Sequence, residues 1–236
     1  MSATAGALGK RAARRRFWLP RWCELLYLDY RRYRAAGRSA LSTVFLSQGF
    51  WASVVYRSSH AFVEWMPHGV LRSSAKTLAA ILQKLMEILT GICLPRDASI
   101  GGGLYLPTFG AIILGRGSIG ENCTIEQNVT LGIAGRGAER GRPTIGKRVF
   151  IGAGAMIVGK ITIGDDAHIF PGSVVTRAVP PRAVVMGYPA RIVSHDGSFD
   201  SIVYDGMEHD PERRAALEES AAGSQGRHPR EGGDPV

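Results

Sequence analysis

Cysteine is scarce in this chain of 236 residues, which contains only Cys23, Cys93 and Cys123. An odd number of cysteines, with no CxxC pair and no cysteine and histidine at ligand spacing, argues against a disulfide framework and against a zinc site. Long apolar runs are also lacking, so no segment is predicted to span a bilayer. Proline and charged residues interrupt the apolar residues after the basic start, which argues against a signal peptide. We therefore expect a cytoplasmic protein that holds no metal.

Acidic residues are fewer than basic ones, 20 against 29, so the formal net charge is +9. Five of the cations cluster at the start of the chain, where such a cluster can bind nucleic acid or an anionic membrane surface. No nucleic-acid-binding module accompanies them, and we expect no nucleic-acid partner. We interpret residues 1–20 as a basic flexible arm. The clustered cations are Lys10, Arg11, Arg14, Arg15 and Arg16.

The stretch from Ile100 to Val179 repeats an aliphatic residue every six positions. A helix would scatter every sixth residue around its axis, whereas a chain that turns a corner every six residues returns each aliphatic to one inward-facing position. Three such faces close a triangular coil of short parallel strands. The first half has one extra residue after Leu106, and twelve repeats with one slip disfavour an ordinary β-rich domain. The repeated residues are Ile100, Leu106, Ile113, Ile119, Ile125, Leu131, Ile145, Ile151, Ile157, Ile163, Ile169 and Val175.

Glycine and small residues occupy fixed places in the repeat. Glycine follows the aliphatic residue at positions 146, 152 and 164, where we expect corners with unusual backbone angles. Ala155, Ala167 and Ser173 are small, as a site beneath the next corner requires. A glycine- and arginine-rich stretch at 133–144 interrupts the repeat, and we expect it to be a loop that projects from a corner. Pro180 and Pro181 are predicted to end the regular coil.

Three amphipathic segments before the coil are predicted to be helices: Trp22–Ala36, Leu41–Trp65 and Val70–Thr90. Gly37, Pro67 and Gly91 supply the stops, and Ser39 or Ser42 can cap the second helix. These helices carry more apolar surface than they can hide among themselves. They should therefore pack on the coil, on copies of themselves in an oligomer, or on a membrane surface as a peripheral contact.

The fold class is thus mainly β, a parallel β-helix with an N-terminal α-helical region. We predict a basic arm at 1–20, a helical region at 21–91, a β-helix domain at 92–195 with a loop at 133–144, and a last part at 196–236. In this last part we expect a short helix at 211–222 and then a polar tail, rich in glycine and proline and disordered, from Gly223.

Several motifs in this order resemble the serine acetyltransferases, a branch of the hexapeptide-repeat acyltransferases. They are DYRRY, QGFWASVVYRSSHAF, VTLG, RPTIG, IGAGAMIVG and GYPARIV, spread over residues 29–193. The resemblance implies that the β-helix is left-handed. It also implies acetyl transfer from acetyl-CoA to the serine hydroxyl, which gives O-acetylserine for cysteine biosynthesis, and a homotrimer or a dimer of trimers whose active sites lie between neighbouring coils.

The catalytic positions of the resembled enzymes are changed in this chain. In those enzymes the base is a histidine after an aspartate in the turn that contains the slip, and a second histidine precedes the proline that closes the loop. Here these positions read Pro107-Thr108 and Arg142-Pro143. Threonine cannot act as a general base near pH 7, so Thr108 and Arg142 are candidate catalytic residues by position only.

The resemblance also implies where coenzyme A binds. Its pantetheine arm would lie along the corner at Gly152, and its phosphates call for cations. The candidate cofactor-binding residues are Gly152, Ala153, Gly154, Lys160, His168, Gly187, Pro189, Ala190 and Arg191. For each glycine, coil geometry alone is an alternative reason, and for His168 an exposed surface histidine is the alternative.

Two other functions remain open from the sequence. One is O-acetylation of a sugar during surface-polysaccharide synthesis, which suits a basic N-terminal part near a membrane. The other is a non-catalytic hexapeptide-repeat scaffold, which suits the loss of both histidines. An acceptor screen separates the two enzymes, and binding of coenzyme A without turnover of serine would leave the sugar acceptor and the scaffold to be distinguished by that screen.

Overall fold

The computed structural model describes residues 21–65, 70–137 and 140–225. The predicted basic arm and the predicted stop at Pro67 lie outside these ranges. The chain divides into two compact units, Met1–Asp205 and Gly206–Val236. The first contains the helices and the coil, and the second contains helix α4 (Pro211–Gln225).

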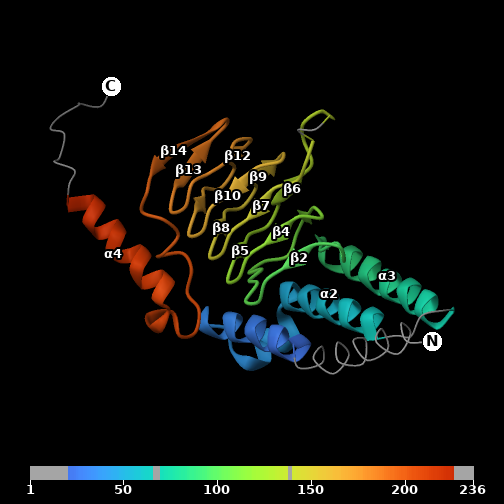
Figure 1. Ribbon diagram of the computed structural model, residues 1–236. Helices are drawn as coiled ribbons and strands as arrows, with labels where there is room; N and C mark the ends of the chain where they lie inside the picture. Colours follow the sequence, from blue (N-terminus) through green and yellow to red (C-terminus); the bar gives the residue numbers. More distant parts are fainter. Residues whose placement is uncertain (1–20, 66–69, 138–139, 226–236) are drawn as a thin grey trace, which may run out of the picture. The chain divides into compact units, whose positions relative to one another are not determined.

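The coil of the first unit consists of three sheets, here called A, B and C, and the chain passes through them in that repeating order (Figure 1). Their strands are parallel except for the last one, β14. Strands of successive coils pair in register within each sheet, so each sheet forms one face of the predicted triangular coil. Sheet A contains β1 (Ile92–Cys93), β3 (Ile112–Leu114), β6 (Thr130–Gly132), β9 (Met156–Val158) and β12 (Val174–Val175). Sheet B contains β2 (Ser99–Ile100), β4 (Ser118–Ile119), β7 (Thr144–Ile145) and β10 (Thr162–Ile163). Sheet C contains β5 (Thr124–Ile125), β8 (Phe150–Ile151), β11 (His168–Ile169), β13 (Val184–Gly187) and β14 (Ala190–Ser194).

The predicted core is confirmed, because the repeated aliphatic residues of the second half stack inside the coil. Ile151, Ile157, Ile163 and Ile169 are all fully buried. The small residues Ala155, Ala167 and Ser173 are fully buried as well, as their place beneath the next corner requires. The coil interior is therefore a continuous packed column.

One repeated residue of the first half was assigned wrongly. Ile113 points outward and is 50% exposed, whereas Ile112 and Leu114 on either side of it are buried. Leu114 pairs with Leu131 in sheet A, so Leu114 is the inward residue of the repeat. Because side chains alternate along a strand, a shift of one residue exchanges the two faces. The turn after Leu106 is therefore longer than the sequence predicted, and the turn after Leu114 is shorter.

The reason for the corner glycines also differs from the prediction. Gly146, Gly152 and Gly164 do not have positive φ angles; the left-handed positions come two residues later, at Arg148, Gly154 and Asp166. At Gly152, for example, a Cβ would lie 2.6 Å from the backbone nitrogen of Pro171 in the next coil. These glycines are needed because the backbones of successive coils come very close at the corners.

The coil also continues past the point where the two prolines were predicted to end it. β13 pairs in parallel with β11 and buries Val185, so it adds one more strand to sheet C. The chain then reverses, and β14 runs antiparallel to β13. This hairpin, not Pro180 and Pro181, is the last element of the coil.

Four helical segments of the described residues precede the coil. A helix covers residues 21–35, and the second predicted helix is divided into η1 (Ser42–Leu46) and α2 (Gln48–Trp65). Ser39 accepts a hydrogen bond at 3.1 Å from the backbone N–H of Ser42, as predicted for a cap. Helix α3 (Val70–Thr90) has the predicted bounds and packs beside α2 (Figure 1). None of the helices in the described ranges is long and apolar enough to cross a membrane.

Helix α4 of the second unit extends to Gln225, so the polar tail does not begin at Gly223 as predicted. Asp210 caps this helix, because its carboxylate accepts hydrogen bonds from the backbone N–H groups of Glu212 at 2.9 Å and of Arg213 at 3.3 Å. The predicted tail after Gln225 lies outside the described residues.

Candidate active site

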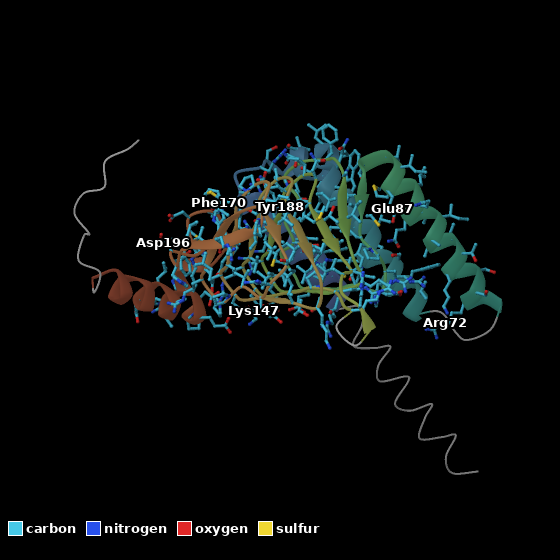
Figure 2. The ribbon with its side chains drawn as sticks, turned by 90° about the horizontal axis from the view of Figure 1, so that it is seen from above. Arg72, Glu87, Lys147, Phe170, Tyr188 and Asp196 are labelled. Atoms are coloured by element: carbon cyan, nitrogen blue, oxygen red, sulfur yellow. The ribbon has the colours of Figure 1, made fainter. Side chains whose placement is uncertain are left out.

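The corner between sheet C and sheet A carries most of the predicted site. Successive coils place residues 107–111, 126–129, 152–155 and 170–173 at this corner, and the β13–β14 hairpin follows in the same column. Thr108 and the segment Gly152–Gly154 are therefore on the same edge of the coil. Figure 2 shows Phe170 and Tyr188 toward one end of the coil, and Glu87 of α3 toward the other.

Thr108 sits in the long turn after Leu106, and its hydroxyl is exposed. Its Oγ1 donates a hydrogen bond at 2.7 Å to the side-chain carbonyl oxygen Oε1 of Gln127, in the next coil. Phe109 beside it is 69% exposed. The hydroxyl thus acts as a donor that ties two coils together.

Arg142 and Lys160 lie at a different corner, between sheets A and B. The loop after β6 projects from this corner (Figure 1), and its two ends are joined by backbone hydrogen bonds between Ala134 and Gly141 at 3.0 and 3.2 Å. The predicted loop is therefore observed. Arg142 is exposed, and the side chain of Lys160 lies directly against Gly141. Within one chain, Thr108 and Arg142 occupy opposite edges of sheet A and do not come together.

The remaining cofactor candidates are divided among these regions. Gly152 is buried against the next coil, whereas Gly154 is exposed at the corner. Gly187 and Ala190 pair with each other at the hairpin, and the Tyr188–Pro189 peptide bond between them is cis. Arg191 is exposed on β14.

His168 lies on the outer face of sheet C, away from the corner. Its ring stacks on Phe170 with centroids 4.9 Å apart and lies 4.6 Å from the ring of Phe150. Its Nδ1 is 3.4 Å from the hydroxyl of Ser201. The side chain points outward, as predicted, but it is half-buried, and this burial lowers its pKa below the ordinary value of histidine.

The lowered pKa of His168 predicts that the protein loses stability as the pH falls. The unfolded chain takes up the proton near pH 6.5, whereas the folded chain resists it, so the penalty develops below about pH 6.5 and is absent above it. Melting temperatures at pH 7.5 and 5.5 measure the effect. We expect His168→Gln to reduce the difference between the two pH values and the exposed control His195→Gln to leave it unchanged. An unchanged difference in both variants would contradict the prediction.

Neither Cys123, which is buried, nor Cys93, which is partly buried, is suited to act as a nucleophile. Burial is the largest cause that raises the pKa of Cys123 to about 12. For Cys93, on sheet A, burial and a hydrogen bond with Glu87 raise the pKa to about 11. The thiolate is the reactive form of cysteine, so both groups are inert near neutral pH.

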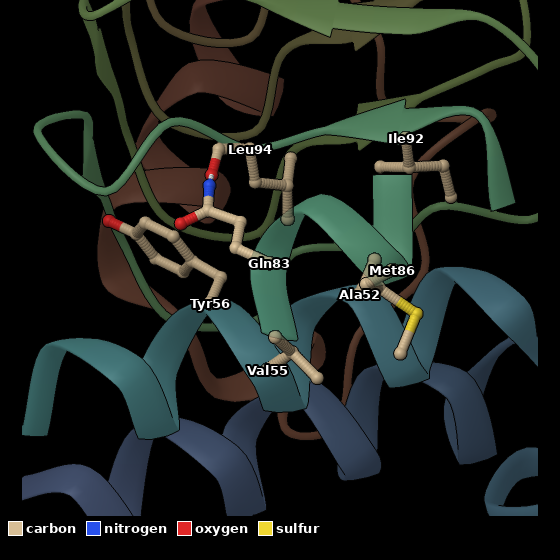
Figure 3. A pocket seen from close by; sticks show the side chains of 7 residues that line it. All are labelled: Ala52, Val55, Tyr56, Gln83, Met86, Ile92 and Leu94. Carbon is tan, nitrogen blue, oxygen red and sulfur yellow. Dashed lines mark hydrogen bonds between the residues drawn. The ribbon is translucent and has the colours of Figure 1, made fainter. Parts of the chain in front are cut away.

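A small pocket lies elsewhere, between α2, α3 and β1 (Figure 3). Gln83 donates a hydrogen bond from its side chain to the carbonyl oxygen of Leu94 beside it. The lining is otherwise mostly apolar and contains no acid, base or thiol that could serve acetyl transfer. It comprises Ala52, Val55, Tyr56, Gln83, Met86, Ile92 and Leu94.

The sequence-based prediction did not include two polar residues near Thr108. Gln127 contacts Thr108 directly, and Glu126 precedes it at the same corner. Glu126 is the one carboxylate among the described residues of the four corner segments at 107–111, 126–129, 152–155 and 170–173. The repeat pattern puts Ile125 one coil after Leu106, so it could have placed both residues one coil below the long turn.

Comparisons with known proteins agree with this architecture. Residues 142–177 match the family model of the bacterial transferase hexapeptide (six repeats). The chain is 34% identical over 171 residues to a serine acetyltransferase of Mycobacterium tuberculosis (strain ATCC 25618 / H37Rv), covering 70% of this chain and 71% of the relative.

Solved structures of serine acetyltransferases are also similar to this chain. The serine acetyltransferase of Brucella abortus strain S19 in complex with coenzyme A superposes with a TM-score of 0.65 at 30% identity, covering 75% of this chain and 70% of that one. The Neisseria gonorrhoeae serine acetyltransferase in complex with serine superposes with a TM-score of 0.62 at 32% identity, covering 74% and 70%.

The fold and these matches define a hexapeptide-repeat transferase built on a left-handed parallel β-helix, as the resemblance implied. More narrowly, the chain belongs to the serine acetyltransferase family. It is therefore an acyltransferase, and the sequence-based recognition of this branch is confirmed.

Proposed function

We propose that this protein transfers the acetyl group of acetyl-CoA to the hydroxyl of serine and so forms O-acetylserine for cysteine biosynthesis in the cytoplasm. Family membership carries this proposal, since the chain shares over 30% identity with serine acetyltransferases across about 70% of its length. Coenzyme A and serine are bound by related structures. The long corner turn of Thr108 is the proposed acceptor site.

The reaction needs a base, because a serine hydroxyl is a poor nucleophile near neutral pH. We assign this role to Glu126, the carboxylate of this corner, which directly precedes the Gln127 that accepts the Thr108 hydrogen bond. Glu126 takes the hydroxyl proton as the serine oxygen attacks the thioester carbonyl. The C–S bond then breaks, and the proton passes to the thiolate of coenzyme A. Thr108 orients Gln127 and is not the base.

Acetyl-CoA is the proposed co-substrate, and we expect it to bind along the corner between sheets C and A. The exposed corner at Gly154 offers an edge along which the pantetheine arm can lie, with Ala153 and the hairpin residues Gly187–Arg191 beyond it. Arg191 is the candidate cation on this side of the coil for the phosphates of coenzyme A. Lys160, at the other edge of sheet A, can reach a phosphate only from a neighbouring chain.

We infer that the working unit is a homotrimer. Thr108 and Arg142 occupy opposite edges of sheet A within one chain, so a site that contains both requires a second coil. The outer face of sheet A carries exposed apolar side chains that a neighbouring coil would cover, among them Ile113 at 50% and Met156 at 42% exposure. Arg142 of a neighbouring chain would then stand opposite Thr108 and bind the serine carboxylate.

We further propose that the apolar face of α3 joins two trimers. Its six aliphatic side chains are between 49% and 73% exposed: Leu78, Ile81, Leu82, Leu85, Ile88 and Leu89. Light scattering should give the mass of a hexamer for the wild type and of a trimer for Leu82→Glu, while Lys76→Glu, exposed on the same helix, should leave the mass unchanged. A trimeric wild type that binds anionic vesicles would instead support peripheral membrane contact.

The acceptor is tested by product analysis. Purified protein is incubated with acetyl-CoA and with L-serine or each of a panel of sugars, and the products are identified by mass. We expect O-acetylserine. Acetylated sugar without O-acetylserine would establish the polysaccharide alternative, and binding of coenzyme A with no product from any acceptor would establish the scaffold alternative.

A further inference from the structure

The turn that carries Thr108 is held by the helical region and not by the coil alone. It belongs to the first coil, so no earlier coil pairs with its backbone. At the later corners, neighbouring coils supply these partners, as between Gly154 and Gln127 at 2.9 Å. The helical region takes the place of the missing coil, much as a capping repeat does in other repeat proteins.

Tyr33 makes the closest connection. Its side chain is fully buried, and its hydroxyl donates a hydrogen bond at 3.0 Å to the carbonyl oxygen of Leu106 and accepts one at 3.3 Å from the N–H of Leu106. Burial raises the pKa of Tyr33 well above its ordinary value, so the phenol keeps its proton. The ring packs edge-on against Tyr105, with centroids 4.8 Å apart.

Arg38 and Gly49 extend this connection along the turn. The Nη2 of Arg38 donates a hydrogen bond at 2.9 Å to the carbonyl oxygen of Pro107, the residue before Thr108. Gly49, in the first turn of α2, lies so close that a Cβ there would be 2.3 Å from the carbonyl oxygen of Leu106. Consecutive carbonyl groups ahead of Thr108 are therefore fixed by side chains of the helical region.

The other end of the turn is fixed by α3. The N–H of Gly110 donates to the carbonyl oxygen of Thr90 at 3.2 Å, and the N–H of Ile112 donates to that of Gly91 at 3.1 Å. The turn is thus held on both sides of Thr108. The hydroxyl of Thr108 connects the middle of the turn to the next coil, through Gln127.

We propose that Tyr33 and Arg38 are positioning residues for acetyl transfer, which set the distance between the Thr108 turn and the carboxylate of Glu126. This inference rests on the proposed function. Small displacements of a reacting geometry lower the rate strongly, whereas binding of coenzyme A along the later corners does not depend on this turn. The helical region therefore contributes to turnover as well as to assembly.

The test compares Tyr33→Phe with Tyr56→Phe. Tyr56 is a matched control, because its buried hydroxyl also donates to a carbonyl oxygen of the coil, that of Ala98 at 2.6 Å, but at the corner between sheets A and B. Each variant loses the hydrogen bond that the phenol donates to a carbonyl oxygen, and Tyr33→Phe also loses the one accepted from the N–H of Leu106, so we expect both variants to be destabilised. We expect kcat with L-serine to fall about 3- to 10-fold for Tyr33→Phe only, with the Kd of coenzyme A unchanged.

Further readouts separate positioning from general destabilisation. Hydrogen exchange in the peptide that covers residues 105–110 should be faster in Tyr33→Phe and unchanged in Tyr56→Phe. Arg38→Lys should retain more activity than Arg38→Ala, because a lysine can still donate to the Pro107 carbonyl. Equal loss of kcat in the two tyrosine variants, or an unchanged kcat in Tyr33→Phe, would overturn the inference while the proposed function stands. A wild type without acetyl transfer would overturn both.

Discussion

Replacement of Glu126 by glutamine is expected to lower kcat/KM for L-serine about 10²- to 10⁴-fold, the usual contribution of a general base. Glutamine keeps the size of the side chain and removes its ability to accept a proton. The Kd of coenzyme A should not change, since the variant leaves the later corners intact. Serine-dependent release of thiol from acetyl-CoA measures the rate.

Two variants serve as controls for this result. Glu121→Gln makes the same chemical change at an exposed position on the corner between sheets B and C, and its activity should equal that of the wild type. Thr108→Val removes the hydrogen bond to Gln127 but no acid or base, so we expect a loss of only about 2- to 10-fold. A Glu126→Gln variant as active as Glu121→Gln would exclude Glu126 as the base.

The second large effect concerns stability. Asp29→Asn is expected to lower the free energy of unfolding by about 3–5 kcal/mol, because it leaves the buried guanidinium of Arg57 without its counter-charge. Asp29 is 0% and Arg57 3% exposed, and the guanidinium donates to the two carboxylate oxygens at 2.6 and 2.8 Å. The same carboxylate accepts from the N–H of Leu104 at 3.0 Å and from the hydroxyl of Ser53. It therefore joins the first helix, α2 and the first coil.

Urea unfolding measures this loss, with Asp205→Asn as the control. Asp205 pairs with Arg31, but their side chains are 54% and 38% exposed, and exposed pairs contribute only about 0–1 kcal/mol. If Asp29→Asn were no more destabilising than Asp205→Asn, the buried pair would not be what fastens the helical region to the coil.

The coil was predictable because its signal is repeated. Where the repeat is regular, as it is from Ile145 to Val175, the neighbouring repeats identify the inward residue even if one corner is ambiguous. Around Leu106 the turn is irregular, and three consecutive aliphatic residues, Ile112, Ile113 and Leu114, fit the inward position equally well by type. Only the pairing of Leu114 with Leu131 identifies the inward residue, and pairing depends on contacts that one sequence does not contain.

The site residues are predicted less directly than the coil. Motifs identify the family, and the resemblance makes Thr108 and Arg142 candidate positions that stay a prediction. Tyr33 lies in a helix whose pattern shows only that it is amphipathic, and Arg38 lies just after that helix ends. Their contacts with Leu106 and Pro107 join residues about 70 positions apart, and no spacing rule predicts such pairs.

The rate of thiol release from acetyl-CoA, measured with and without L-serine, tests the central claim most directly. We predict release that depends on serine and saturates with its concentration, although the resemblance puts threonine and arginine at the positions of the two family histidines. Equal rates with and without serine, in a protein shown by calorimetry to bind coenzyme A, would contradict the assignment of this chain as a serine O-acetyltransferase.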